Sequence, residues 1–582
     1  MNMENLRNSL LLSDNGDLYE ELLDYMRTPD QTSIESIIEK TPAELKNDIT
    51  EYTEQLLSLF LNNREEYRRS YTYGQIIIWQ EILETYKKLI KQRNFIESIN
   101  LIYDENNYYL ANLELKKILL AYSSMQNSLS ELEDAFGVDR FLDRISGKTF
   151  EVLNTIIRQT KIKLEKKIRT YKDLYQSKWN STNVYSTIIH KLIQRNDTNQ
   201  VCDQFTSKNK QCIFLLIDGL GFCQYLWNTH IHANQYNYTF KENIFYWLSE
   251  SKLSKEMILG SSLITDTGSG LAQIYFGQEA NRTNIFASKL RRKFSSDKFF
   301  ETKRITPTEF SSFFKHNNSI TNVVRSCGLD AKVYYCSKYS DDVSGFSKNL
   351  FDMAEVKQVL PAERVFSVLL EDIDDGMTEG LQVLYLTGID NTGHTMGAYS
   401  RFERMEHSKF DGLFRNFLVE LAYNHPDLFD NERSIIISAD HGMYESSNLM
   451  INRTTILDYL RNDGIRGIKL VENNRALLVY NEGESSLEQI QKSLEDFFLE
   501  KGILVDIRAF SNGINDSDII PDLAIRLISE GLFFSNDRIN GHLLHYGGHG
   551  GFSLDEVFIP FIEIPLTTEL YSSIDKRFLS KK

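Results

Sequence analysis

The chain has 582 residues, of which 41% are hydrophobic and 25% charged, a composition typical of globular proteins with two or three domains. Its formal net charge of −16 argues against holding duplex DNA by bulk charge. No run reaches the 18 apolar residues of a membrane-spanning helix, and five cysteines without C-x-x-C spacing indicate reduced thiols. Because the first residues also lack the pattern of an export signal, we expect a cytoplasmic protein without membrane contacts.

The first third of the chain has the pattern of helices. Only four of the 30 glycines and two of the eight prolines precede residue 210. Apolar residues recur every three or four positions from Leu153 to Tyr175, and most lysines of that stretch lie off the apolar stripe. We therefore expect an all-α domain over residues 1–205 that binds protein partners or regulates the rest. Its basic helix could contact nucleic acid, but frequent acidic neighbours favour a solvated face.

After residue 206 apolar strands alternate with helical patterns such as residues 409–423. The strands lie in "CIFLLIDGLGF" (212–222), "LQVLYLTGIDNTGH" (381–394) and "RSIIISADHGM" (433–443). This alternation predicts an α/β fold, with a mostly parallel sheet flanked by helices. Ligand sites in such sheets gather beyond the carboxyl ends of the strands, so polar side chains at those ends are expected to converge.

A carboxylate follows each of the three strands, and a histidine follows two of them. Together with the histidines of the glycine-rich segment 544–556, they are Asp218, Asp390, His394, Asp440, His441, His545 and His549. This mixture of ligands suits zinc or manganese, and two such ions can hold both oxygens of a phosphoryl transfer. Taken singly, each residue has an ordinary structural reading, such as a turn aspartate or a helix cap. The prediction of a metal site therefore depends on their joint occurrence.

The segment "SSLITDTGSGLAQIYFG" (261–277) offers a nucleophile. Thr265, Thr267 and Ser269 precede a run of small residues that can open a helix. A hydroxyl at a helix N-terminus faces unpaired N–H groups and the positive end of the dipole, a place that favours a phosphate. The alternative is that a Thr or Asp of this segment only caps the helix.

The order of these motifs resembles the alkaline phosphatase superfamily, particularly its nucleotide pyrophosphatase/phosphodiesterase branch. The ending "HGGFSLDEVFIPFIE" (549–563) is more similar still to the PglZ domain of the same superfamily. The resemblance covers about residues 210–565, and its specific segments are "ADHG" and "HGGFSLDE". It implies an alkaline phosphatase-like catalytic domain over residues 206–582, with a cap-like insertion at about 278–380.

The resemblance also implies a ligand set and a nucleophile. One metal ion is expected on Asp218, Thr267, Asp440 and His441, and the other on Asp390, His394 and His549. Thr267 is preferred to Thr265 as nucleophile because family members usually have a glycine ten residues later, as Gly277 is here. Two departures stand out: Ile264 replaces the usual proline, and Gly270 replaces the asparagine that phosphodiesterases place three residues after the nucleophile.

The implied function is metal-dependent phosphoester hydrolysis with two divalent ions, zinc or else manganese. We expect a phosphodiesterase that acts on a nucleotide or oligonucleotide through a phosphothreonine at Thr267, in bacterial phage defence or signalling. The basic, aromatic segment 289–304 would grip the nucleotide if it is not simply a solvated surface. The alternative of another class is a catalytically silent scaffold subunit of a bacterial defence complex, which metal content and phosphoesterase activity would distinguish.

Overall fold

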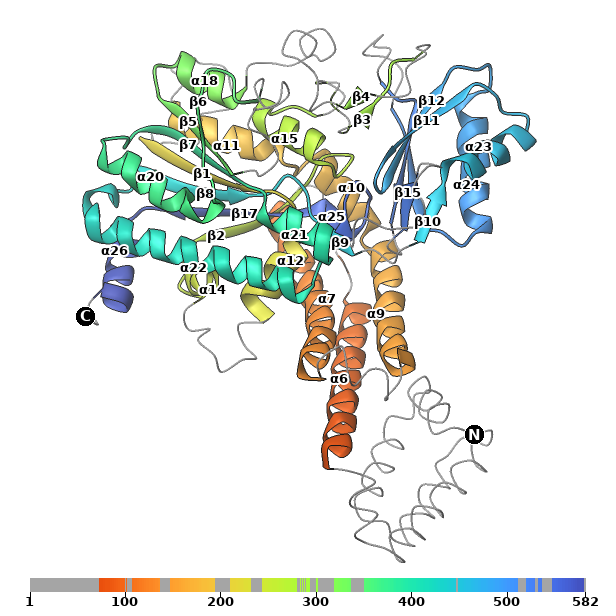
Figure 1. Ribbon diagram of the computed structural model, residues 1–582, viewed down its shortest axis with the longest axis horizontal. Coiled ribbons are helices and arrows are strands. Elements are labelled where there is room, and N and C mark those ends of the chain that lie inside the picture. Colours follow the sequence, from red (N-terminus) through yellow and green to blue (C-terminus); the bar gives the residue numbers. More distant parts are fainter. Residues whose placement is uncertain are drawn as a thin grey trace, which may run out of the picture. The chain divides into compact units, whose positions relative to one another are not determined.

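The structure is a computed structural model that describes most of the chain between residues 73 and 579 (Figure 1). It leaves undescribed residues 1–72, 100, 102–106, 137–146, 194–209, 232–242, 280–282, 284, 286, 288, 294–299, 302–318, 337–349, 446–448, 511–519, 529–531, 536–546 and 580–582. The chain forms two compact units, and the first takes, of the described residues, 73–99, 120–136 and 147–164. Among the described helices, none has both the length and the apolar character required to cross a bilayer.

The described part of the first unit is helical. It contains α6 (Tyr73–Ser98) and parts of α7 (Tyr108–Phe136) and α9 (Gly147–Lys167), two helices that continue into the second unit. The apolar stripe predicted from the sequence is confirmed, because α9 and α10 (Arg169–Ser177) follow one another there. All seven residues of the stripe are buried: Leu153, Ile157, Thr160, Leu164, Ile168, Tyr171 and Tyr175. Lys172 departs from the expectation of a solvated basic face, because its side chain is fully buried against Glu165.

The second unit is built on a seven-stranded sheet, which confirms the predicted α/β fold. Its strands, in spatial order, are β2 (Lys255–Gly260), β17 (Phe558–Pro565), β8 (Arg433–Ser438), β1 (Gln211–Ile217), β7 (Gly380–Leu386), β5 (Ala331–Cys336) and β6 (Glu355–Gln358). Only β17 runs antiparallel to its neighbours in this sheet. Every residue of β1 and β8 is buried, as expected for strands covered on both faces.

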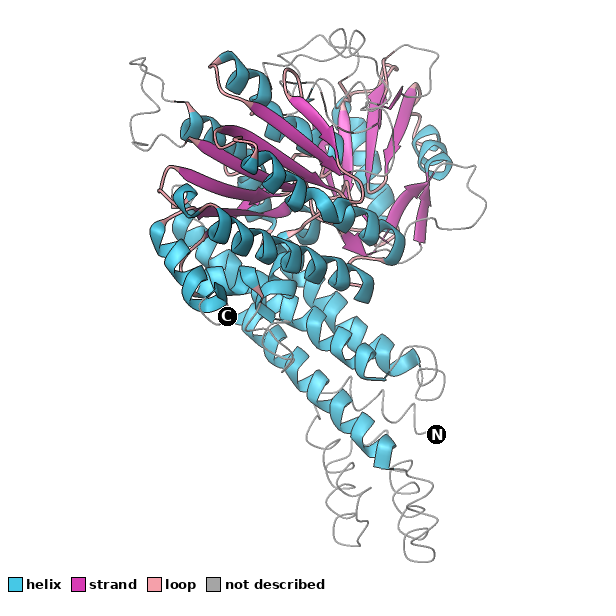
Figure 2. Cartoon of the chain, turned by 60° about the vertical axis from the view of Figure 1, so that its left-hand side comes forward, coloured by secondary structure: helices cyan, strands magenta, loops and turns pink. Residues whose placement is uncertain are grey.

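Helices cover the sheet (Figure 2). They include α11 (Thr182–Leu192), α12 (Phe222–Leu226), α14 (Ile244–Glu250), α15 (Thr267–Phe276), α18 (Ile320–Ser326), α20 (Val365–Asp374), α21 (Gly388–Met396), α22 (Arg401–Asn424), α25 (Leu554–Val557) and α26 (Thr568–Ile574). Shorter helical turns are η2 (Trp227–Ile231), η5 (Ala362–Arg364), η6 (Pro426–Leu428) and η7 (Asp575–Leu579). The helix expected at 409–423 lies within α22, whose Phe414 stacks on Phe245 of α14.

A smaller sheet, which the sequence did not reveal, is inserted between β8 and β17. Its strands are β11 (Ile468–Asn473), β12 (Ala476–Asn481), β14 (Leu523–Leu527) and β13 (Val505–Ala509), and its helices are α23 (Arg453–Asn462) and α24 (Leu487–Glu500). Three two-stranded pairs accompany the sheets: β10 (Leu449–Asn452) with β15 (Leu532–Ser535), β3 (Lys289–Leu290) with β4 (Phe300–Glu301), and β9 (Tyr444–Glu445) with β16 (Gly547–Gly548).

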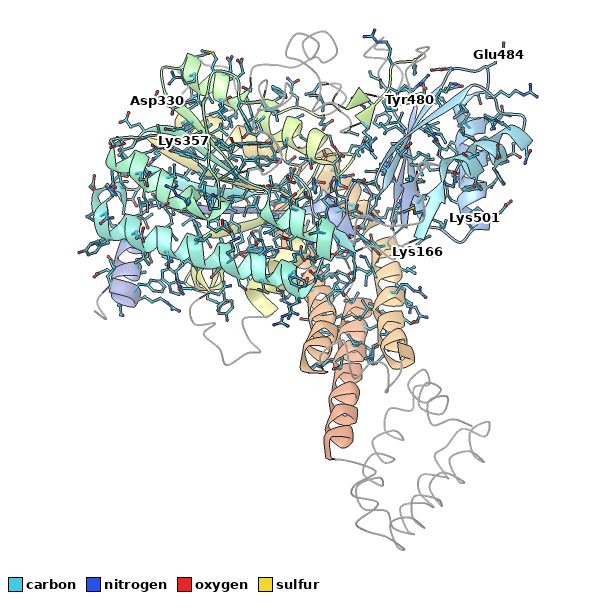
Figure 3. All side chains as sticks on the ribbon, viewed as in Figure 1. Lys166, Asp330, Lys357, Tyr480, Glu484 and Lys501 are labelled. Atoms are coloured by element: carbon cyan, nitrogen blue, oxygen red, sulfur yellow. The ribbon has the colours of Figure 1, made fainter. Side chains whose placement is uncertain are left out.

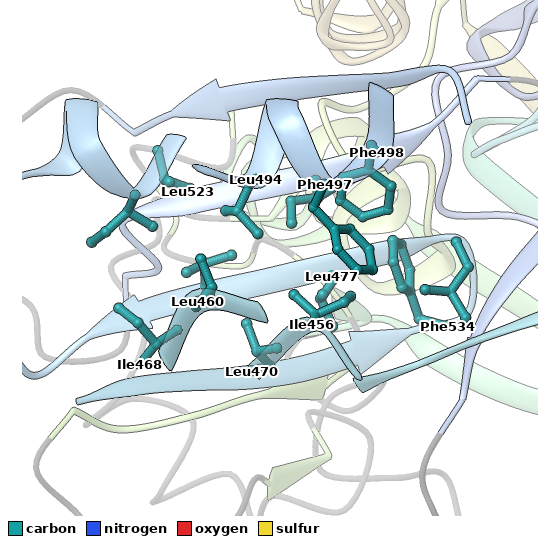
Figure 4. Close-up of a cluster of buried hydrophobic side chains, with 14 of the residues drawn as sticks. Ile456, Leu460, Ile468, Leu470, Leu477, Leu494, Phe497, Phe498, Leu523 and Phe534 are labelled. Atoms are coloured by element: carbon teal, nitrogen blue, oxygen red, sulfur yellow. The ribbon is translucent and has the colours of Figure 1, made fainter. Parts of the chain in front are cut away.

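The two helices of the smaller sheet enclose an apolar core with it (Figure 4). Leu460 of α23, Phe497 and Phe498 of α24, and Leu477 of β12 are buried there. The charged Glu484 and Lys501 lie at the outside of this region (Figure 3). The smaller sheet therefore has its own hydrophobic core.

The expected cap-like insertion at 278–380 needs a correction. Its described part from residue 319 onward supplies β5 and β6 to the large sheet and the helices α18 and α20 beside it. β5 pairs in parallel with β7, and β6 with β5, so these strands extend the sheet instead of covering the site. The partner-binding role and the boundary at residue 205 stay predictions, although α10 and α11 already belong to the unit of the large sheet.

Candidate active site

Thr267 is the first residue of α15. The helix begins there because the Asp266 side chain accepts the Gly268 N–H at 2.9 Å, and it ends at Gly277 in the left-handed conformation. Asp266 therefore caps this helix, and the Thr267 hydroxyl is not the cap. The Thr267 hydroxyl oxygen lies 2.9 Å from Nε2 of His441, so it faces the predicted ligands.

The two other hydroxyls of this segment have structural partners. Thr265 Oγ1 accepts the Gly550 N–H and donates to the Gly551 carbonyl, both at 3.0 Å. Ser269 Oγ donates to the Ile264 carbonyl at 2.6 Å. Both side chains are buried, and their bonds hold backbone in place. Thr267 is therefore the hydroxyl of the three that the structure directs at the histidine cluster.

Three buried carboxylates come together where β1, β7 and β8 end. Asp218 follows β1, Asp440 follows β8, and Asp390 lies in the first turn of α21. A Cβ on Gly219 would come within 2.9 Å of the Asp390 Cβ, so a glycine is needed for this close approach. The sheet edge thus brings together side chains that are far apart in the chain.

Each of these carboxylates has an oxygen that accepts no hydrogen bond from the described residues, namely Oδ1 of Asp218, Oδ1 of Asp390 and Oδ2 of Asp440. Their other contacts are specific: Tyr385 donates to Asp218 Oδ2 at 2.6 Å, and the Gly219 N–H donates to Asp440 Oδ1 at 3.3 Å. Burying an anionic oxygen without a partner is costly. Three such oxygens in one place fit a bound cation.

The three histidines are oriented by backbone carbonyls. Nδ1 of His394 lies 3.0 Å from the Gly547 carbonyl oxygen, and Nδ1 of His549 lies 3.1 Å from that of Thr265. Nδ1 of His441 lies 3.0 Å from its neighbour's carbonyl oxygen at Gly442. Because a carbonyl only accepts, each Nδ1 carries a proton, which leaves Nε2 as the nitrogen that can bind a metal ion. This is the arrangement that metal-binding histidines typically have.

Among the described residues, two groups of potential ligands meet the distances that a metal ion requires. One is Asp390, His394 and His549, and the other is Asp218, Asp390 and His441, with ligand atoms within 4.8 Å of one another in each group. The first agrees with the ligand set that the resemblance implies. Asp390 lies in both groups, which was not expected. His545 lies outside the described residues.

Asp440 adjoins the second group, with Oδ2 3.6 Å from Nε2 of His441. His549 connects the two groups, because its ring stacks on His441 with centroids 3.9 Å apart and lies 5.1 Å from the ring of His394. The structure therefore brings the predicted ligands and Thr267 into one continuous cluster.

Negative charge is concentrated in the cluster, and this shifts the pKa values of its members. Burial raises the pKa of the Asp218 carboxyl well above its usual value, and the charges of Asp440 and Asp390 raise it further. Burial likewise raises the pKa of Asp440. Burial lowers the pKa of His441, but the charges of Asp440 and Asp390 outweigh it and leave that pKa raised. The repulsion among these carboxylates and the raised pKa of His441 indicate that positive charge is favoured here.

Two residues of the site were missed or unexplained at the level of sequence. Tyr385 looked like one more apolar residue of a buried strand, although its hydroxyl fixes Asp218. Gly270 stands where an asparagine was expected, and a Cβ there would lie 2.6 Å from the Asp440 carbonyl oxygen. Because α15 packs so closely on Asp440, no side chain fits at residue 270.

The basic segment 289–304 is described only in part. Arg291 binds Glu482 at 3.0 Å and Lys293 binds Asp522 at 2.7 Å, both on the smaller sheet. These two cations therefore form ion pairs within the protein. Residues 294–299 and 302–304 lie outside the described part.

The fold and the cluster define an α/β protein with a candidate dinuclear metal site at the carboxyl edge of its sheet. No family model matches the chain, and no curated protein matches it. Among solved structures, it is similar to murine ectonucleotide pyrophosphatase/phosphodiesterase 5, at 16% identity over 63% of this chain and 94% of that chain, with a TM-score of 0.43. It is also similar to phosphonoacetate hydrolase from Sinorhizobium meliloti 1021, at 14% identity over 63% and 95%, with a TM-score of 0.45. At such values, function has to be argued from the site itself.

Proposed function

We propose that the protein is a metal-dependent phosphoester hydrolase whose nucleophile is Thr267. The observation that carries this proposal is the position of the Thr267 hydroxyl, at the start of α15 and 2.9 Å from His441, beside three carboxylates with unsatisfied buried oxygens. A nucleophile, a nitrogen ligand and anionic ligands thus share one edge of the sheet. That combination is what a two-metal phosphoryl transfer requires.

The ligands fit two divalent ions, for which we propose zinc, with manganese as the alternative. Asp218, Asp440 and His441 would hold one ion beside Thr267, and Asp390, His394 and His549 would hold the other. When bound, the ions would supply positive charge for the nucleophile, the leaving oxygen and the phosphoryl oxygens.

The protein's own groups position the reaction. The Thr267 hydroxyl gives its proton to solvent, and its Oγ1–P bond forms as the bond from phosphorus to the leaving oxygen breaks; the leaving oxygen takes a proton from solvent. Water then attacks phosphorus and breaks the Oγ1–P bond, and Oγ1 takes up the proton that the water loses. The contact between Thr267 and His441 aims the hydroxyl at the ligands. The positive end of the α15 dipole lies at the same residue and favours the phosphoryl group.

The proposed substrate is a phosphodiester of a nucleotide or oligonucleotide, and the proposed setting is bacterial phage defence or signalling in the cytoplasm. What supports this is the similarity of "HGGFSLDE" (549–556) to the end of PglZ domains. Partner binding is proposed for residues 1–205. The rival proposal, a silent scaffold subunit, predicts a protein that binds partners without hydrolysing phosphoesters.

Activity on bis-p-nitrophenyl phosphate and on a panel of nucleotides, with zinc or manganese, tests the proposal. Thr267→Ala should lower turnover by roughly 10³-fold or more, since the nucleophile is lost. Thr395→Ala is the matched control, because this exposed threonine lies one residue from His394 and bonds only within α21. Mass spectrometry after acid quenching should find phosphate on the wild-type peptide that contains Thr267. Equal turnover in Thr267→Ala and wild type would remove Thr267 from the mechanism.

A further inference from the structure

Two loops carry the reacting groups. The nucleophile loop, residues 261–266, leads into Thr267, and the histidine loop, residues 547–553, carries His549. They are joined directly through Thr265, whose hydroxyl and carbonyl bind Gly550, Gly551 and His549. The distance between Thr267 and His549 therefore depends on these Thr265 contacts and on the other residues that hold the two loops in place.

Arg526, in β14 of the smaller sheet, contacts both loops. Its Nη1 donates to the Leu263 carbonyl of the nucleophile loop at 2.6 Å. Its guanidinium lies over the ring of Phe552 in the histidine loop, 4.0 Å from the centroid. The adjacent Leu527 accepts the Phe552 N–H at 2.8 Å, so backbone and side chain hold the same residue. Arg526 is fully buried, unlike an ordinary surface arginine, so its charge must be satisfied by contacts within the protein.

The remaining contacts fix the plane of this guanidinium. Nε and Nη2 donate to Asp506 Oδ2 at 3.1 and 2.5 Å, and Nη1 donates to Gln176 Oε1 at 2.7 Å. Gln176 in turn donates to the Ser262 carbonyl of the nucleophile loop at 2.7 Å. A guanidinium can make these bonds in several directions at once, whereas an ammonium cannot match the same fork.

Lys172 also holds Phe552. Its Nζ lies 4.1 Å from the ring centroid and donates to the Phe552 carbonyl at 2.5 Å and to Glu165 Oε2 at 2.6 Å. Phe552 thus contacts two buried cations that come from different parts of the chain. Both cations hold the histidine loop, while only Arg526 also binds the nucleophile loop by a hydrogen bond.

We infer that Arg526 is a positioning residue for the reaction, which sets the spacing of Thr267 and His549 by binding both loops. The predicted effect of Arg526 on catalysis rests on the proposed function. Its predicted effect on metal binding by His549 does not, and can be tested by metal affinity alone. It assigns a role to the smaller sheet: β14 supplies the fixed point for two loops of the large sheet. A positioning residue of this kind typically changes metal affinity or rate by about 10- to 100-fold.

The test compares Arg526→Lys with Arg169→Gln in the full-length protein. Arg169 is the matched control, because its Nη2 binds the same carboxylate, Asp506, at 3.0 Å, while its side chain is 54% exposed. Arg526→Lys should weaken zinc binding, measured by competition with a chelator, by about 10-fold or more. It should lower kcat by about 100-fold and change KM far less. Arg169→Gln should leave both unchanged.

Gln176→Met is the second variant, in case Arg526→Lys does not fold. It keeps the charge of Arg526 and removes the amide that binds both Arg526 and Ser262. It should lower kcat by about 10-fold with a wild-type unfolding temperature. A folded Arg526→Lys with wild-type zinc affinity and kcat, or a Gln176→Met with wild-type kcat, would overturn the inference.

The two proposals fail in different ways. A wild-type protein that hydrolyses no phosphoester would refute the proposed function, and the chelator competition would still decide the role of Arg526. A Thr267→Ala variant that loses turnover, beside an Arg526→Lys variant that keeps both turnover and zinc affinity, would refute the positioning role alone.

Discussion

Two groups among the buried carboxylates of this protein differ in their partners. The site group, at the edge of the large sheet, is Asp218, Asp390 and Asp440. The frame group, around the smaller sheet and α10, is Glu165, Asp506 and Glu556. Each member of the frame group binds a lysine or arginine, at 2.5 to 3.0 Å. No member of the site group forms a salt bridge to a lysine or arginine within the described residues.

The pKa values reflect the same difference. Burial raises the pKa of Asp506, but Arg526 and Arg508 outweigh burial and hold it at about 2. Burial raises the pKa of Asp218, and its carboxylate neighbours add to that effect. Burial alone therefore does not mark a metal site. The feature that distinguishes the site group is a set of three buried carboxylates whose charges act on one another and for which the described residues supply no lysine or arginine.

The largest effect is expected from Asp390, which belongs to both groups of potential ligands. Asp390→Ala should reduce the metal content from about two ions per chain to less than one, and lower activity by roughly 10³-fold. His394→Ala should lose about one ion, since it belongs to a single group. Elemental analysis after gel filtration measures both. Two retained ions in Asp390→Ala would show that the site group is not the metal site.

The next effect concerns the frame group. Lys172→Met should lower the free energy of unfolding by about 3–5 kcal/mol, because it leaves Glu165 buried without its cation. Adding Glu165→Gln to this variant should restore part of the loss. Urea unfolding of the two variants and wild type measures the difference. If Lys172→Met alone is as stable as wild type, the buried pair contributes nothing.

The smallest effect is a dependence on pH. Asp506 has a pKa of about 2 in the folded protein, below that of an unfolded aspartate near 4, so its stabilising effect is complete above pH 4 and disappears as pH falls toward 2. Asp506→Asn should be less stable than wild type by about 2 kcal/mol at pH 7, and the difference should shrink toward zero at pH 2. Urea titrations at several pH values test this. A difference that is constant with pH would mean that charge is not its cause.

The strands of the large sheet and the convergence of its candidate ligands were predictable because the signal is local. "IIISADHGM" (435–443) contains both the buried strand and the side chains that follow it, and parallel strands bring their ends to one edge. The convergence of Asp218, Asp390 and Asp440 thus follows from three short segments. Asp390 belongs to both groups of potential ligands because Gly219 lies so close to it, and no sequence pattern predicts this close contact.

The smaller sheet was missed for a physical reason as well. Its strands β11 and β12 form a hairpin around Asn474, whose φ of 51° suits such a turn, but β11 carries Glu472 and the turn carries Arg475. Charged residues in a hairpin usually indicate a solvated face, and here both are buried. The error at 278–380 arose because strand order does not follow chain order, so β5 and β6 looked like an insertion between two motifs.

The place of β17 has a consequence for biosynthesis. This strand is the last in the chain, yet it lies between β2 and β8 and pairs with both. During synthesis, the edges of β2 and β8 that pair with β17 therefore stay unpaired until residue 565 has left the ribosome. Unpaired strand edges can pair with other chains. His549 lies nine residues before Phe558, the first residue of this strand, so the last candidate ligand and the strand that closes the sheet both come late in synthesis. A partly made protein would then be inactive, and it would be a natural client for chaperones.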